Sequence, residues 1–454
     1  MKKEIKVALL MAASLFIDML DGTIVTTALP KISNYFHTSS STAALLVSVY
    51  LITLAIFIPM SGWLANRFGK KNIWMLAVIV FTLSSLGNTL SPNFEILLIM
   101  RIIQGFSAAL MTPTARLIVL EKTPASQLLR MVSYLIWPAL IAPAIAPIAG
   151  GFIITYWSWH WIFLINIPIG IIITFIGSNL IENDTANIKT PFDWFGFFEI
   201  TAASALVLVG AELATHGSKY WIAALLMVII GIFFGFNVLK HLKTTDNPLF
   251  SVAALKVTSF RICQTNGSVL WLSVGAMPYL LTVFLQTIFQ WSPVKAGSYV
   301  LFIFLGNIGI KPFTNPIIRR LGYRGALLAS FFMVLASSIA LAFINAATIG
   351  ILIMLLALIS GVGRSLALTA FNGLNLSEIH PKDRNSANTL SSVVQTLAQG
   401  IGVSIITVVV NLLQSIAASS TAYKLGFVFL GLLMVLPIIK TISLPKDIGH
   451  MTIK

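Results

Sequence analysis

Apolar stretches, each long enough to cross a lipid bilayer, occupy almost the whole of this 454-residue chain. Hydrophobic residues make up 57% of the sequence and charged residues 9%, whereas soluble proteins carry about 25% charged residues. A membrane-spanning helix needs about 20 apolar residues, so the sequence predicts an all-α membrane protein with fourteen spanning helices. The expected spans are 7–28, 42–64, 72–90, 96–118, 131–156, 161–181, 194–213, 220–240, 263–288, 297–317, 325–345, 348–373, 387–413 and 424–443.

Lysine and arginine residues indicate how the chain is oriented. They gather in alternate connections, and the opposite side carries only Lys31, Lys219, Lys295 and Lys424. Because cationic loops stay in the cytoplasm, both termini are expected to be cytoplasmic, which an even number of spans requires. The net charge of +15 then reflects this topology and the anionic inner leaflet of the bilayer. It does not indicate nucleic-acid binding.

The composition also excludes several kinds of site. Cys263 is the single cysteine, which rules out an internal disulfide and a CxxC metal or redox site. The six histidines are not at metal-ligand spacing, and no nucleophile–base arrangement is visible. We therefore expect no metal, no cofactor and no enzymatic activity. The longest polar connection, from Glu182 to Asp193, is too short to form a soluble domain.

A weak internal repeat indicates two halves. NRFGKKNIW at Asn66–Trp74 and RRLGYRGAL at Arg319–Leu327 both place Arg-x-Gly-x-(Lys/Arg) in an expected cytoplasmic turn. Transporters with repeated halves bind substrate between them. The sequence thus predicts two pseudo-symmetric six-helix bundles around a central cavity, formed by residues 1–181 and 261–454. Residues 182–260 would be a linker with two extra helices.

Charged side chains inside the expected helices are the strongest candidates for function. A charge at the bilayer centre costs roughly 2.5–3.5 kcal/mol on insertion scales, so a retained one usually works or is paired. Asp18 and Asp21 are three residues apart in the first helix and share one face. Such carboxylates can take up and release protons, which makes both candidates for proton coupling. Alternatively, either faces water or caps a helix break at Gly22.

Arg101 in the fourth expected helix lies at a depth similar to that of Asp21, given a rise of about 1.5 Å per residue. The two side chains can pair if the first and fourth helices are neighbours. Arginine does not deprotonate in proteins, so Arg101 would act electrostatically, holding Asp21 ionised when close and letting it protonate when apart. The alternative is a fixed structural ion pair.

Besides Arg101, Lys311 and Arg364 are the cations assigned to the interior of expected helices. The aliphatic part of Lys311 could carry its amine towards the cytoplasmic surface. Arg364 is near mid-helix and could contact substrate or pair with an acidic group. Neutral hydrogen-bonding side chains could line the same substrate cavity. The candidates are Gln286, Gln290, Gln395 and Gln399.

The fifth expected helix combines Pro138, Pro143 and Pro147 with Gly150 and Gly151. Proline removes backbone hydrogen bonds and bends a helix, and glycine lets helices approach closely. The segment is expected to be bent and closely packed, as suits a hinge between the halves. Simple packing is the alternative.

At these residues, and across its whole length, the chain resembles the fourteen-helix drug:proton antiporters of the major facilitator superfamily, the EmrB/QacA type, and most of all their MdtD-like members. Four motifs carry the resemblance and occur in the expected order. LDxTIVxxALP matches Leu20, Asp21, Thr23, Ile24, Val25, Ala28, Leu29 and Pro30; GxLaDrxGrkxxl matches Gly62, Leu64, Arg67, Gly69, Lys70 and Lys71; RxxQG matches Arg101, Gln104 and Gly105; and the motif ending GPxxGG matches Pro147, Gly150 and Gly151.

The chain departs from these motifs at three positions. Asn66 stands where the loop motif has an acidic residue, so the charge-based latch attributed to that residue in the family is in doubt, and a neutral hydrogen bond would replace it. Ala142 and Ala146 stand at two usual glycines. Both are small, but the packing there must be less close.

The resemblance implies an antiporter of the bacterial inner membrane that uses the proton gradient, without a cofactor, to expel hydrophobic and often cationic drugs by alternating access. Its partners would be the small-molecule substrate, protons and the lipid bilayer; no adaptor protein is indicated. The motif residues, Gln104 included, would serve the conformational change. One alternative is an exporter of a single metabolite class, with Lys311 or Arg364 holding an anionic substrate. Another is a membrane sensor or scaffold, which no sequence feature favours.

Overall fold

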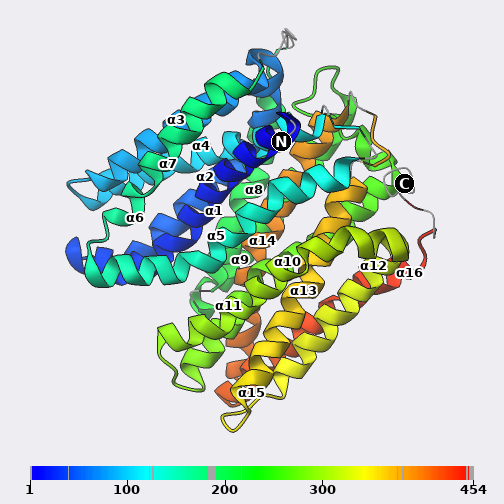
Figure 1. Cartoon of the computed structure of the whole chain (residues 1–454). Coiled ribbons are helices and arrows are strands. Elements are labelled where there is room, and N and C mark those ends of the chain that lie inside the picture. The colour runs from blue at the N-terminus through cyan, green and yellow to red at the C-terminus, as the bar shows by residue number, and fades with distance from the viewer. Residues whose placement is uncertain are drawn as a thin grey trace.

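The computed structural model describes residues 3–38, 40–121, 123–124, 127–182, 191–215, 217–375, 377–380, 383–445 and 448. Within these ranges the chain is helical, and no strand occurs (Figure 1). The helices run roughly parallel to a common direction. The start of α1 and the end of α16 lie at the same end of the molecule (Figure 1). Many large apolar side chains are exposed, among them Phe175, Ile222 and Phe236, as expected of helices that face lipid.

The N-terminal helices follow the expected spans, with α1 and α4 longer than predicted. The expected sixth span is divided by Ile165 into a short α6 and α7. Their bounds are α1 Lys3–Tyr35, α2 Ser40–Phe68, α3 Lys70–Thr89, α4 Phe94–Glu121, α5 Leu128–Tyr156, α6 Trp161–Leu164 and α7 Asn166–Leu180.

The remaining helices include two interrupted spans. The chain breaks at Ile310 between α11 and α12, and the last expected span is divided at Met434 between α15 and α16. The bounds are α8 Trp194–Ala214, α9 Trp221–Thr244, α10 Thr258–Thr287, α11 Pro293–Gly309, α12 Lys311–Ala342, α13 Gly350–Asn375, α14 Arg384–Gln414, α15 Ser419–Leu433 and α16 Val435–Ile442, with short 3₁₀ turns at Ser218–Tyr220 and Ala253–Lys256.

Twelve helices of the described residues are long and apolar enough to cross a membrane, so the predicted count of fourteen is not confirmed. The helix α11 has 17 residues, which is at the lower limit for a crossing. Helix α12 counts once, although it contains the end of the tenth expected span and most of the eleventh. Helix α5 is not among the twelve.

Packing is densest among helices that are close in sequence. In the first part, α1 packs on α5, and α4 packs on α2 and α3; in the last part, α13 packs on α11 and α12, and α10 packs on α14. Helices α8 and α9 pack mainly on each other, and α8 also touches α2 and α14. The division at residues 181 and 261 stays a prediction.

The two copies of the internal repeat have related backbones. Gly69 lies before α3 with φ 89° and ψ 139°, and Gly322 interrupts α12 with φ 68° and ψ 171°. A residue with a side chain rarely adopts a positive φ. The glycine shared by the two copies is thus the residue that lets the chain turn at both places.

Candidate functional site

A buried ion pair joins α1 to α4. The Nη1 atom of Arg101 lies 2.5 Å from Oδ2 of Asp21, and both side chains are fully buried. The pairing expected from the similar depths of the two residues is therefore present. The guanidinium also donates from Nε to the Leu46 carbonyl of α2 at 3.1 Å, so Arg101 holds three helices together.

Two amide side chains complete the surroundings of Asp21. Its Oδ1 accepts from Gln104 Nε2 at 3.0 Å and from Asn166 Nδ2 at 2.8 Å. Gln104 is oriented by its own carbonyl oxygen, which accepts from Arg101 at 2.7 Å and from Asn88 at 2.8 Å. All four of these neighbours are fully buried. Three donors from α4 and α7 thus surround a carboxylate that is fully buried.

Asp18 lies one turn away on α1 and has different partners. Its Oδ1 accepts a hydrogen bond from the Tyr50 hydroxyl, and its Oδ2 accepts from Thr112 Oγ1 at 2.6 Å. The Arg101 guanidinium carbon lies 4.4 Å from the centre of the Tyr50 ring, within the range of a cation–π interaction. Tyr50 therefore contacts both the Asp21–Arg101 pair and Asp18.

Arg116 continues this chain of polar contacts towards α14. It follows Thr112 by one turn on the same face of α4, and Arg116 and Asp18 interact electrostatically. Its Nη1 donates to Gln395 Oε1 of α14 at 3.1 Å. Gln395 was predicted to line the substrate cavity, and the structure connects it to the N-terminal helices.

Lys311 and Arg364, the other cations predicted inside helices, have neutral partners in the part of the chain that the structure describes. Lys311 is the first residue of α12 and donates to Thr369 Oγ1 at 2.8 Å, while Arg364 of α13 donates to Ser273 Oγ at 3.4 Å. Lys311 is 5% exposed and Arg364 2%. Within the described residues, no carboxylate contacts either cation, and Arg364 Nε has no hydrogen-bond partner. Of the two alternatives for Arg364, pairing with an acidic group is not seen within the residues that the structure describes.

The remaining glutamines do not form a cluster. Gln286 and Gln399 are half-buried in α10 and α14, and Gln290 is exposed in the turn after α10 with φ 53°. A small cavity of about 30 Å³ lies between α10, α13 and α14. Its lining residues are Cys263, Gln264, Trp271, Phe371, Asn375, Ser391, Val394 and Gln395.

Three motif glycines sit where helices meet closely. A Cβ on Gly105 would lie 2.7 Å from the Tyr50 carbonyl oxygen, and one on Gly62 would lie 2.6 Å from Thr389 Oγ1 of α14. A Cβ on Gly150 would overlap Thr27 of α1, whereas one on Gly151 meets no atom within 4 Å. Pro147 lies within α5, but its side chain is outside the described part of the structure.

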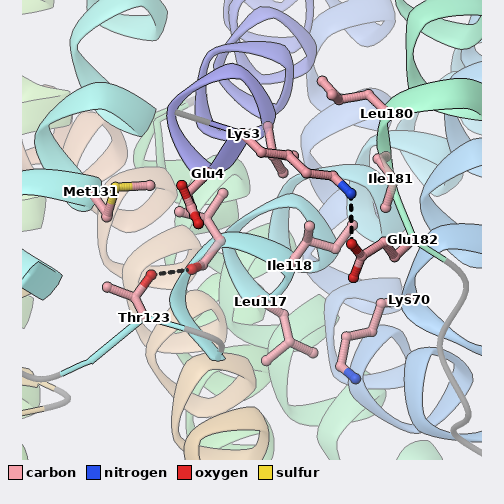
Figure 2. A pocket seen from close by; sticks show the side chains of 12 residues that line it. Lys3, Glu4, Lys70, Leu117, Ile118, Thr123, Met131, Leu180, Ile181 and Glu182 are labelled. Atoms are coloured by element: carbon pink, nitrogen blue, oxygen red, sulfur yellow. Dashed lines mark hydrogen bonds and ion pairs between the residues drawn. The ribbon is translucent and has the colours of Figure 1, made fainter. Parts of the chain in front are cut away.

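The loop motif lies beside a larger cavity. Asn66 and Arg67 are half-buried at the end of α2, and Lys71 donates to the Ser178 carbonyl at 2.8 Å. Lys70 lines a cavity of about 240 Å³ at the end of the N-terminal helices, where Lys3 points at Glu182 and pairs with it at 2.6 Å (Figure 2). None of the predicted substrate residues lines this cavity.

Contacts from the start of α14 join the C-terminal helices to α2 and to the end of α4. Arg384 donates to the carbonyls of Leu120 and Thr123 at the end of α4, at 3.3 and 3.1 Å. Asn385 donates to the Gly62 carbonyl at 3.1 Å. Near the loop motif that carries Asn66, the amide of Asn385 thus connects α14 to the backbone of α2.

Several site residues were missed by the sequence analysis. Asn166, Tyr50 and Thr112 are uncharged, and nothing in the sequence places them beside the aspartates. Arg116 was not a candidate either, although it lies near the end of the expected span 96–118; α4 continues beyond it to Glu121. No group of three or more His, Cys, Asp or Glu that could bind a metal occurs in the ranges that the structure describes.

Comparison with known proteins gives matches over nearly the whole chain. The sequence profile of the Major Facilitator Superfamily matches residues 11–403. A protein of Citrobacter koseri named multidrug resistance protein MdtD is 30% identical over 446 residues, covering 96% of this chain and 94% of its own length. A protein of the same name from Pectobacterium atrosepticum is 32% identical over 432 residues, covering 94% and 92%.

Solved structures share the fold at low sequence identity. The human organic anion transporter MFSD10 (TETRAN) aligns with a TM-score of 0.71 and 14% identity, covering 97% of this chain and 100% of its own. A bacterial homologue of the iron transporter ferroportin, in an outward-facing state, aligns with a TM-score of 0.66 and 16% identity, covering 98% and 100%. At these identities the likeness establishes the fold alone.

Proposed function

Since the chain belongs to the major facilitator superfamily, we propose that it is an antiporter that exports small hydrophobic molecules in exchange for protons. Members of this superfamily are multi-pass membrane transporters, so the chain is a transporter and not an enzyme. The relatives named multidrug resistance protein MdtD favour drug-like substrates.

The observation that carries the proposal is the buried Asp21–Arg101 pair. Separating two buried charges is unfavourable because each loses its partner in a low-dielectric site. Protonation of Asp21 removes that constraint, since a neutral carboxyl group no longer needs a cation beside it. Arg101 stays charged and retains Leu46, Gln104 and the Tyr50 ring as partners. The protonation state of Asp21 would thus set how firmly α1, α2 and α4 are held together.

Alternating access then requires that this local change reach the contacts between the halves. Tyr50 and Thr112 hold Asp18, and Arg116 connects the same face of α4 to Gln395 of α14. Helix α5 packs on α1 and also contacts α11 and α13. In our proposal a movement of α1 relative to α4 is transmitted by α5 and by Arg116, and opens the halves at one end.

We place the transporter in the bacterial inner membrane with both termini in the cytoplasm and fourteen crossings. The two crossings beyond the twelve apolar helices would be α5 and the combination of α11 with the start of α12 up to Gly322. The cationic connections support this orientation. No cofactor enters the mechanism, because the proton gradient supplies the energy.

A transport experiment in membrane vesicles tests this proposal. It compares wild type with Asp21→Asn, which keeps the shape of the side chain and removes its charge. A pH gradient is imposed across inside-out vesicles, and unrelated hydrophobic compounds and small metabolites are added in turn. We expect several compounds to collapse the gradient in wild type and none in Asp21→Asn. Glu95→Gln, which changes an exposed carboxylate on α4, is the matched control.

The same panel separates the two candidate functions. A response to one compound class alone would identify a metabolite exporter instead of a drug exporter. The buried cations Lys311 and Arg364 keep this second candidate in consideration, because a metabolite anion would supply their missing partner. Equal collapse in wild type and Asp21→Asn would overturn the assignment of proton coupling to Asp21.

A further inference from the structure

Acidic residues are absent from the helices of the C-terminal part. Helices α10 to α16 contain no Asp or Glu, and the acidic residues of the sequence after Asp246 are Glu378, Asp383 and Asp447. The same helices contain Lys311 and Arg364 in buried positions. No carboxylate of this half can therefore reach the two cations along a helix.

The helices that surround Arg364 offer it no countercharge either. Helix α13 packs on α10, α11, α12 and α5, and none of these has an acidic residue. The guanidinium has one long hydrogen bond to Ser273, and its Nε atom is buried without a partner in the described residues. A buried guanidinium left this way is costly, so an anion from outside the chain would stabilise it.

The face of α13 that carries Arg364 leads to the small cavity. Phe371 and Asn375 follow Arg364 by seven and eleven residues, which places all three on one side of the helix. Both line the cavity together with Trp271 and Gln264 of α10. The guanidinium of Arg364, the ring of Phe371 and the amide of Asn375 thus lie one after another along one face of α13, over a length of about 16 Å.

Lys311 adds a second cation on the neighbouring side of α13. Its amine reaches Thr369, which lies between Arg364 and Phe371 in the sequence. Both cations are in the same part of the chain as Gln395 of α14, which accepts a hydrogen bond from Arg116 of α4. The cavity holds about 30 Å³, room for only a few water molecules, so the helices around it must move apart before an organic molecule enters.

We propose that α10, α13 and α14 form the substrate site and that its substrates are organic carboxylates with an apolar body. The carboxylate would pair with Arg364, assisted by Lys311, and the apolar body would lie against Trp271 and Phe371. This assignment rests on the proposed export function, whose substrate it narrows to anions. It favours the carboxylate over the cationic drugs expected from the sequence, because a cation would add to the unbalanced positive charge.

Equilibrium binding to the purified protein tests this assignment. The probes are organic carboxylates of increasing size, beginning with naphthoate, each paired with its neutral amide, together with the cation tetraphenylphosphonium. We expect at least one carboxylate to bind more tightly than its amide. Arg364→Gln should weaken that carboxylate by about 10- to 100-fold, the usual loss of a charged hydrogen bond, and leave the amide within about twofold.

Two further variants keep the result interpretable. Arg364→Lys retains the charge and should recover part of the affinity, which a merely structural role would not predict. Arg319→Gln removes an exposed charge from the same half and should leave binding unchanged. A thermal unfolding measurement on each variant establishes that the binding loss does not come from misfolding.

The assignment is overturned if no carboxylate binds better than its amide, if tetraphenylphosphonium binds instead, or if chloride alone responds to Arg364→Gln. Binding at equilibrium needs no proton gradient, so these outcomes would leave Asp21-dependent antiport untouched. Conversely, carboxylate binding with no proton exchange in vesicles would contradict the antiport proposal and retain the anion site.

Discussion

The buried charged side chains of helices α1–α7 and those of helices α10–α16 differ in their partners. In the first group Asp21 has Arg101 within 2.5 Å, and Asp18 accepts two side-chain hydrogen bonds. In the second group Lys311 and Arg364 reach hydroxyl groups only, within the described residues. A paired charge can respond to a proton, and an unpaired cation can respond to an anion. This contrast is the basis of our two proposals, in which the first group couples transport to protons and the second binds the substrate.

The largest expected difference is in the free energy of unfolding, between a variant that loses Arg101 and one that loses Arg364. Arg101→Met leaves Asp21 buried without its cation, and breaking a buried pair in this way costs about 3–5 kcal/mol. Arg364→Met removes a charge that has no carboxylate partner, so the free energy of unfolding should stay within about 1 kcal/mol or rise. Thermal unfolding of the two purified variants in the same detergent measures the difference. Equal destabilisation would contradict the contrast.

A double substitution sharpens this comparison. Asp21→Asn combined with Arg101→Met removes both charges, so the double variant should recover about 1–3 kcal/mol of the stability lost in Arg101→Met. The same unfolding assay measures it. Strictly additive effects would mean that the two side chains do not interact, despite their contact in the structure.

Two neighbouring glycines of α5 test how closely α5 packs against α1. Gly150→Ala places a Cβ against Thr27 and Ile24 of α1, and overpacking of this kind costs about 1–3 kcal/mol. Gly151→Ala meets no atom within 4 Å and should stabilise the helix by up to about 1 kcal/mol. Unfolding midpoints that shift in the same direction would show that α1 and α5 are not in close contact.

The smallest effect is expected where the two halves touch. Arg384→Gln weakens the donors to the carbonyls of Leu120 and Thr123, which should cost about 1 kcal/mol of the contact and favour separation of the halves. Spin labels at the exposed Asn72 and Arg320, in a variant without Cys263, would report the distance between α3 and α12. An unchanged distance distribution would show that Arg384 does not hold this end closed.

The sequence predicted the class of fold and the central ion pair for clear physical reasons. Long apolar stretches must be spanning helices, and Asp21 and Arg101 stand out because charges are rare inside them. The positions of the breaks were harder. Gly309 and Pro312 flank the break at Ile310, and Pro437 follows the break at Met434. Proline also occurs inside unbroken helices, such as Pro59 in α2 and Pro113 in α4, so the division of these spans depends on tertiary packing.

Partners across helices could not be predicted either. Asn166 contacts Asp21 only because α7 packs on α1 in one register, and a sequence pattern within one helix does not fix that register. The same holds for Thr369 beside Lys311. The absence of acidic residues from α10–α16 was visible in the sequence, but its meaning required the burial of Arg364.

The central claim is that Asp21 couples transport to protons without binding the substrate. Its most direct test compares uphill accumulation with exchange of labelled for unlabelled substrate, in the same vesicles, for wild type and Asp21→Asn. The probe is the compound that collapses the pH gradient most strongly in wild type. We predict that Asp21→Asn abolishes accumulation and retains exchange. Loss of both activities in a folded variant, or accumulation equal to that of wild type, would contradict the account.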